Sequence, residues 1–182
     1  AIWKKTITLS YSANGGSGAP TYQSATIYNA TTTSNFTLSS TKPTRTGYSF
    51  LGWSTSSTAT ASSYSPGGSI TLSDSDTLYA VWEINTYTVS FNGNGGSGVP
   101  SSQTKTYGVT LTLSSTKPTR TGYTFLGWAT SSAATSPTWT AGGSYTTNAS
   151  NVLFAVWSVN KYYLDLNGYL DGNTASNISG YG

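Results

Sequence analysis

The sequence predicts a mainly β protein of the α+β class, in which strands dominate, and three observations carry that prediction. Short runs alternate polar and apolar residues, which is the pattern of a strand with one buried face. Thr, Tyr, Trp and Val, which favour half-buried pleated surfaces, are frequent, and 20 Gly and 6 Pro supply turns. Only 7% of the 182 residues are charged while 36% are hydrophobic, which is not the composition of a disordered chain.

An internal repeat dominates the chain. Residues 38–57 and 113–132 are identical at 18 of 20 positions, at an offset of 75. Residues 14–20, NGGSGAP, match residues 94–100, NGGSGVP, at an offset of 80. The two offsets differ by five, which places an insertion in the first copy between residues 20 and 38. We expect it in a loop or hairpin tip, where added length costs little.

The repeat divides the chain into two modules and a remainder. We expect residues 1–83 to form the first module and residues 84–158 the second. Residues 159–182 then begin a third module or another domain. The opening strand pattern returns at residues 161–168, but the glycine-rich turn does not, because residues 169–172 read YLDG.

Each module opens with the same elements. Residues 6–11 and 86–91 alternate strictly and predict the first strand. The Asn-Gly-Gly-Ser-Gly that follows cannot continue a strand and predicts a turn. A second alternating run predicts a strand at residues 24–28 in the first module and at residues 109–113 in the second.

The second half of each module begins with Thr-Lys-Pro-Thr-Arg-Thr-Gly, which breaks the strand pattern because proline fixes φ and glycine permits a sharp turn. The aromatic-rich residues 48–53 predict a third strand, and each module closes on a strand that ends in Ala-Val-Trp. Residues 65–72 carry a weak signal for a short helix before that last strand. Strands therefore account for most of the predicted structure.

The residue types leave little room for catalysis. The chain has no Cys, Met or His, which removes disulfides, thiol nucleophiles and a Ser-His-Asp triad. A Ser-Lys pair is compatible with the composition, but nothing marks a nucleophile turn. No acidic residue recurs in both modules, which argues against a catalytic carboxylate pair; the acids are Asp74, Asp76, Glu83, Asp165 and Asp171. We expect no enzyme activity and no cofactor.

Acidic and amide residues near the end of the chain resemble an oxygen-ligand calcium loop. Residues 165–168, DLNG, are followed by residues 171–173, DGN. The loop spacing and the terminal Glu of such a site are missing. Asn-Gly and Asp-Gly hairpin turns account for the same residues and are the favoured interpretation.

Basic residues give the chain a net charge of +3 but are thinly spread, which argues against a nucleic-acid partner. Lys42 and Arg45 recur as Lys117 and Arg120 in the same predicted loop, and these four are the candidate surface-binding residues. A repeated basic pair suits acidic cell-surface polymers, while a solvated loop is the alternative. No stretch approaches the ~18 apolar residues that membrane insertion requires.

The aromatic residues of the third strand have two interpretations. Tyr48, Phe50 and Trp53, with their copies in the second module, could form a sugar-stacking platform. A core wall is favoured, since Tyr48 and Phe50 share one face of the strand.

The motifs quoted above resemble the Listeria–Bacteroides repeat, also called the internalin B-repeat. The resemblance covers about residues 4–157 as two tandem copies, and its marker is Gly-Tyr-x-Phe-x-Gly-Trp. It implies small β-grasp-like modules of mixed strands with at most one short helix. It implies no catalytic residues. The Gly/Ser-rich segment before the last strand departs from the family pattern and puts the helix in question.

The resemblance and composition lead to three functional hypotheses. The first is an extracellular structural and adhesive module that acts as spacer and interaction surface in a bacterial surface protein. The second is a structural protein of a bacteriophage virion, in the tail, fibre or head decoration. The third is a glycan-binding module. Expected partners are other domains of a longer chain and cell-surface glycans or proteins, with oligomerisation through domains outside this chain.

Overall fold

A computed structural model describes residues 2–28 and 31–162. These residues form two compact units, one within residues 2–86 together with residues 106–108, and one of residues 87–105 with residues 109–162. Strands are the regular elements of both units, and the described residues contain no helix. The structure thus confirms the predicted β architecture. The segment predicted to begin a third module lies almost wholly outside the described residues.

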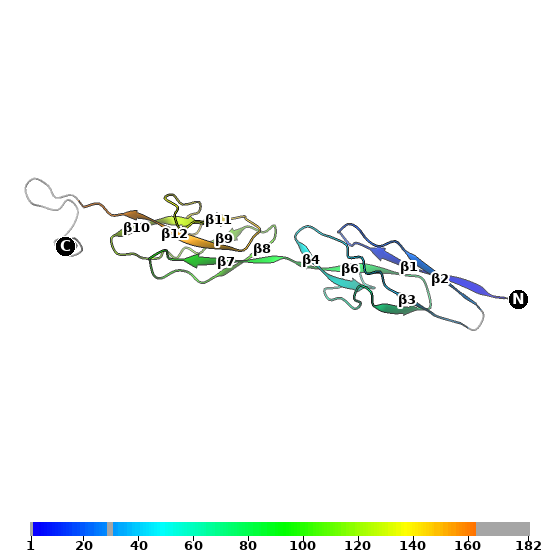
Figure 1. Ribbon diagram of the computed structural model, residues 1–182. Helices are drawn as coiled ribbons and strands as arrows, with labels where there is room; N and C mark the ends of the chain where they lie inside the picture. The colour runs from blue at the N-terminus through cyan, green and yellow to red at the C-terminus, as the bar shows by residue number, and fades with distance from the viewer. Residues whose placement is uncertain (1, 29–30, 163–182) are drawn as a thin grey trace, which may run out of the picture. The chain divides into compact units, whose positions relative to one another are not determined.

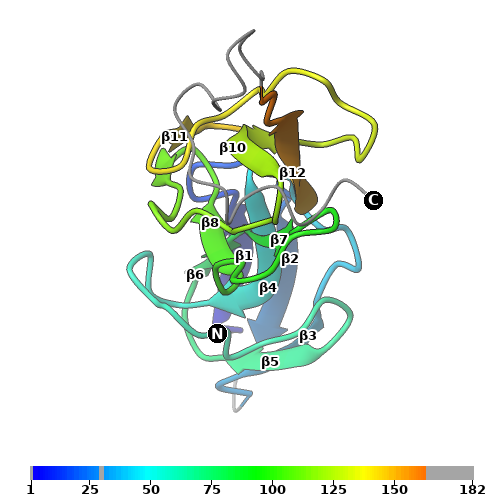
Figure 2. The ribbon, with the colours of Figure 1, turned by 90° about the vertical axis from the view of Figure 1, so that its left-hand side faces the viewer.

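The first unit contains one mixed sheet and one small strand pair (Figure 1). The sheet has the order β2-β1-β6-β4, in which β1 and β6 are parallel and the other neighbours antiparallel. Its strands are β1 (Lys4–Ser12), β2 (Gln23–Tyr28), β4 (Tyr48–Ser54) and β6 (Asp76–Ile84). β3 (Ser34–Thr37) and β5 (Ser69–Leu72) pair with each other beside the sheet (Figure 2).

The second unit repeats this plan. Its sheet has the order β10-β12-β7-β8, with β12 and β7 parallel. The strands are β7 (Thr86–Asn92), β8 (Gln103–Thr106), β10 (Tyr123–Ala129) and β12 (Asn151–Val159). β9 (Leu111–Thr112) and β11 (Ser144–Tyr145) form the small pair. The parallel central pair in each unit fits the mixed-strand fold that the sequence resemblance implies.

The core of each unit lies on the apolar face of its alternating strands. In the first unit Ile7 and Leu9 of β1 are fully buried against Trp53 of β4. In the second unit Trp128 takes the same place, with the rings of Phe91 and Phe125 in edge-on contact at centroid distances of 4.8 and 5.0 Å. Large aromatic side chains supply the buried area that a small module needs.

Two sequence expectations are wrong. The predicted strand at residues 109–113 is too long, because a turn at Tyr107 and Gly108 precedes it and only Leu111–Thr112 is a strand, β9. The second strand of this unit is β8, which follows the offset of 80 rather than 75. The weak helix signal at residues 65–72 is also wrong, because Pro66 and Gly67 form a turn and Ser69–Leu72 is β5. Ile70 and Leu72 are buried on one face of β5, which is the period of a strand.

A lysine holds the loop before the closing strand in each unit. Lys5 of β1 bonds the Asp74 carboxylate and the Ser73 carbonyl. The hydrogen bond from the Lys5 ammonium, followed by its charge, holds the pKa of Asp74 below its ordinary value. This pair therefore favours the folded state above the ordinary carboxyl pKa, and the effect is lost as the pH falls through the lowered value. In the second unit Lys105 of β8, only 1% exposed, donates to Asn148 Oδ1 at 2.7 Å.

Candidate binding groove

The glycine-rich turn of each module meets the Thr-Arg-Thr-Gly loop, although the two lie far apart in sequence. Ser97 and Thr119 exchange two backbone hydrogen bonds, both of 2.9 Å. Ser17 and Thr44 do the same in the first unit, at 2.8 and 2.9 Å. These paired bonds fix the two segments as the rims of a groove, which we call groove 1 in the first unit and groove 2 in the second.

Asn94 shapes the turn on one rim of groove 2. Its backbone is left-handed, with φ +48°, a conformation that asparagine tolerates better than most residues. Its side-chain Nδ2 donates to the carbonyl oxygens of Ser132 and Ala155, at 2.8 and 3.1 Å. Asn14 makes the equivalent bonds to Ser57 and Ala80 in the first unit. The asparagine therefore ties the turn to two other parts of the module.

Replacing Asn94 separates its two roles. We expect Asn94→Gly to lose two hydrogen bonds, about 2 kcal/mol of unfolding free energy, while keeping the left-handed backbone. Asn94→Ala should lose about 1 kcal/mol more, because alanine is strained at positive φ. Urea unfolding of the two variants measures both values. Equal losses in the two variants would show that the backbone conformation contributes nothing.

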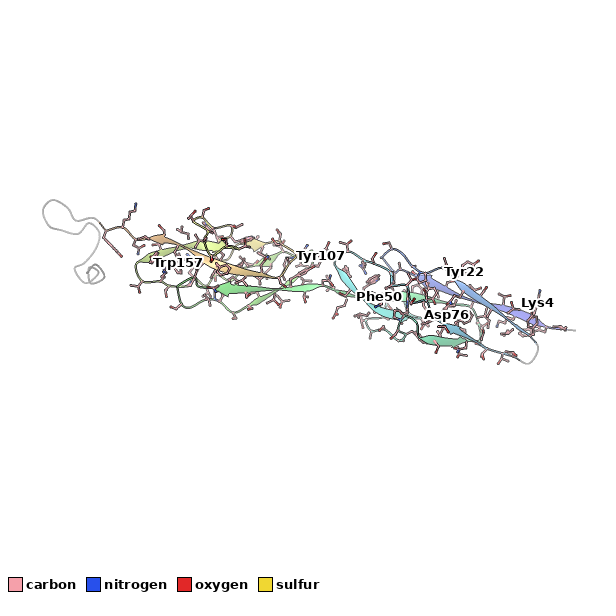
Figure 3. All side chains as sticks on the ribbon, viewed as in Figure 1. Lys4, Tyr22, Phe50, Asp76, Tyr107 and Trp157 are labelled. Atoms are coloured by element: carbon pink, nitrogen blue, oxygen red, sulfur yellow. The ribbon has the colours of Figure 1, made fainter. Side chains whose placement is uncertain are left out.

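Trp157 of β12 lines groove 2, and Figure 3 labels it. Its indole Nε1 donates to the Gly93 carbonyl at 2.9 Å, and Trp82 bonds Ala13 in the same way at 3.0 Å. The indole packs directly on Gly96, where a Cβ atom would lie 2.4 Å from Trp157 Cζ2. The second glycine of the motif is thus required by the close approach of this ring.

Arg120 forms one wall of groove 2. Its guanidinium carbon lies 3.8 Å from the centroid of the Tyr123 ring, a cation–π contact. Its Nη1 donates to the Asn94 carbonyl at 3.3 Å. Arg45 stacks on Tyr48 in the first unit, also at 3.8 Å. Both arginines are half-buried, so their guanidinium groups are held in place rather than free in solvent.

The two grooves are similar hollows of different size. Both are open to solvent, with volumes of about 570 Å³ for groove 2 and about 350 Å³ for groove 1. Hydroxyl groups, one arginine and aromatic rings line each of them. The residues shared by position are Ser17, Pro43, Thr44, Arg45, Thr46, Tyr48, Phe50 and Trp82 in groove 1, and Ser97, Pro118, Thr119, Arg120, Thr121, Tyr123, Phe125 and Trp157 in groove 2.

The four candidate surface-binding residues fall into two classes. Arg45 and Arg120 line the grooves, while Lys42 and Lys117 are exposed on the loop beyond them and are not part of the lining. The structure therefore brings one arginine, not a basic pair, to each groove. Lys42 and Lys117 stay predictions as surface-binding residues.

The aromatic residues divide in a way that sequence analysis missed. Trp53 and Trp128 are fully buried and belong to the core. Phe50 lies between the core and the groove, with its ring edge-on to Trp53 at 5.1 Å and to Trp82 at 5.5 Å. Tyr48 and Phe50, with their copies Tyr123 and Phe125, line the grooves together with the tryptophan that closes each Ala-Val-Trp motif. The sequence signal that could have identified this tryptophan as a groove residue was its recurrence in both modules, at the end of a buried strand.

Charge differs between the two units. Residues 87–162 contain no acidic residue, and their cations are Lys105, Lys117, Arg120 and Lys161. The first unit has Asp74, Asp76 and Glu83 beside its basic residues. Groove 2 thus has no carboxylate within the described part of its unit, whereas Glu83 follows Trp82 of groove 1 directly in sequence.

Other site types were sought in the same residues. Within residues 2–28 and 31–162, no three or more His, Cys, Asp and Glu side chains gather as metal ligands. The calcium-like segment at residues 165–173 lies outside the described part. No helix in the described residues could cross a membrane.

Comparison with known proteins identifies similar sequences. Residues 8–81 and 87–156 match the model of the Listeria-Bacteroides repeat domain. A protein of Evansella cellulosilytica, provisionally named as a Gly-rich membrane protein, is 34% identical over 136 residues, which cover 73% of this chain and 15% of that protein. A second protein of that organism, provisionally named as a membrane protein, is 33% identical over 171 residues, 92% of this chain and 24% of its own length. No solved structure matches the chain.

Proposed function

The chain belongs to the Listeria–Bacteroides repeat family, and on that basis we propose that it is a non-catalytic repeat segment of a bacterial surface protein, serving as spacer and interaction surface outside the cell. The observation that carries the proposal is duplication. Two units of one fold each present a groove lined by the same residue types at the same positions.

Duplication of a whole module suits a spacer, because each unit has a core of its own. Repeated modules extend a chain without requiring new chemistry. The names of the two relatives, provisionally membrane proteins, support a location at the cell envelope. This chain aligns with less than a quarter of the length of each. Most of such a protein is then available for anchoring and for other domains.

The location can be tested on intact cells that produce the native protein. Antibodies against residues 87–162 should label unpermeabilised cells, and external protease should remove that labelling. A cytoplasmic protein serves as the control and should stay protected in the same cells. Labelling that appears only after permeabilisation would overturn the surface location. Recovery of the chain in purified phage particles instead would support a virion protein.

A further inference from the structure

Groove 2 combines a fixed cation with hydroxyl and aromatic groups, and we propose that it binds a carboxylated sugar unit of an acidic polysaccharide. This inference builds on the proposed surface role and names the partner of that surface. The open groove has a volume of about 570 Å³, enough for one or two sugar rings. Arg120 would bind the carboxylate, while the aromatic walls would contact the apolar face of a sugar ring.

Arg120 is preorganised for an anion. The guanidinium has five N–H donors, and within the described residues one hydrogen bond to the Asn94 carbonyl accounts for one of them. Stacking on Tyr123 holds the plane of the group at 3.8 Å from the ring, so little conformational entropy is lost when an anion binds. The remaining donors match a carboxylate, which accepts two parallel hydrogen bonds from arginine.

The charge of the second unit favours an anionic partner. No acidic residue lies in residues 87–162, so no carboxylate in the described part of this unit competes for Arg120. Lys117 lies on the same loop and is exposed, where it adds positive potential near the groove.

The lining favours a sugar over an acidic peptide. Ser97, Thr119 and Thr121 supply hydroxyl groups that both donate and accept hydrogen bonds, as sugar hydroxyls do. Trp157 and Phe125 add apolar area beside them.

Binding of the 182-residue chain to polygalacturonate tests the inference. Two matched ligands serve as controls: methyl-esterified polygalacturonate keeps the sugar ring without the charge, and poly-L-glutamate keeps the charge without the sugar. We expect binding to polygalacturonate that weakens as salt is added, and at least about tenfold weaker binding to each control ligand. Equal binding of poly-L-glutamate would overturn the sugar assignment.

Variants of the chain locate the site. Arg120→Gln should weaken binding by about tenfold or more, and Arg120→Lys should restore little, because lysine cannot form the stacked, two-pronged contact. Arg45→Gln is the internal control and should have a smaller effect, since groove 1 is smaller and Glu83 lies beside its tryptophan in sequence.

Because Arg120 also contacts Tyr123 and Asn94, its variants are checked for folding by thermal unfolding. Thr121→Glu provides a second variant, since this exposed residue lines the groove and the new carboxylate would compete with the ligand for Arg120. It should abolish binding by repelling the carboxylate. Full binding by folded Arg120→Gln and Thr121→Glu chains would overturn the site. Either result is independent of where the protein is located, so the surface proposal stands or falls separately.

Discussion

Replacing Trp128 by alanine should unfold the second unit and leave the first one folded. Trp128 is fully buried at the centre of its core and contacts the rings of Phe91 and Phe125. Truncating such a side chain costs about 3–5 kcal/mol. At about 0.05–0.15 kcal/mol per residue, a unit of this size has a stability near the lower end of the usual range of about 5–15 kcal/mol, so a large part of it would be lost. The first unit keeps Trp53 and a separate core.

Hydrogen exchange read by mass spectrometry separates the two units, because peptides from residues 1–86 and 109–162 report on each. Leu126→Ala is the matched control on the same strand, since Leu126 is 39% exposed and points away from the core. It should change the unfolding free energy by less than about 1 kcal/mol. Loss of protection in both units of the Trp128→Ala chain would show that they do not fold independently.

Trp128→Phe refines this prediction. Within the described residues, the buried Nε1 of Trp128 has no hydrogen-bond acceptor, and the same holds for Trp53. Phenylalanine removes that buried donor and keeps most of the apolar area. Its cost should therefore be well below that of alanine, which the same exchange measurement would show.

The second large effect is expected at Gly127, where alanine should cost about 3 kcal/mol or more. Gly127 has φ +149°, and a Cβ atom there would lie 2.4 Å from the Trp139 carbonyl oxygen and 2.7 Å from Pro137 Cβ. Both strain and collision therefore oppose a side chain. The strand pairing of β10 with β12 shifts register between Phe125 and Gly127, which marks a β-bulge.

Gly98→Ala is the control for Gly127→Ala. Gly98 also has positive φ, +74°, but a Cβ atom added there would have no atom within 4 Å among the described residues. It should cost only the backbone strain, about 1 kcal/mol. Urea unfolding of the two variants compares these values. Equal costs would mean that the structure next to Gly127 adapts and that the bulge is not rigid.

The bulge explains how the aromatic residues reach the core together. In a regular strand Phe125 and Trp128, three residues apart, would point to opposite faces of the sheet. The register shift at Gly127 brings both rings to one face, with their centroids 5.0 Å apart. The same shift at Gly52 brings Phe50 and Trp53 together. The glycine in each Gly-Tyr-x-Phe-x-Gly-Trp motif that precedes the tryptophan therefore allows the bulge that places both aromatic rings on the core face of the sheet.

The sequence by itself determined the two-module organisation, the strand character and the position of most strands. Identity between residues 38–57 and 113–132 is visible without any structure. Alternation marks β1 and β7 because one face of each is buried, and aromatic residues mark β4. The interpretation that the third-strand aromatic residues belong to the core, rather than to a sugar-stacking platform, was also correct for Trp53. These features depend on residues close together in the chain.

Only the tertiary structure decided which aromatic and basic side chains form a site. Trp157 and Arg120 share a groove because β7 lies parallel to β12 and carries the glycine-rich turn to the Thr-Arg-Thr-Gly loop. Lys105 stands at the position where the first module has Ala25. Local sequence does not signal that this lysine is buried. Strand order and pairing across 60 or more residues set these contacts, and local periodicity carries no information about them.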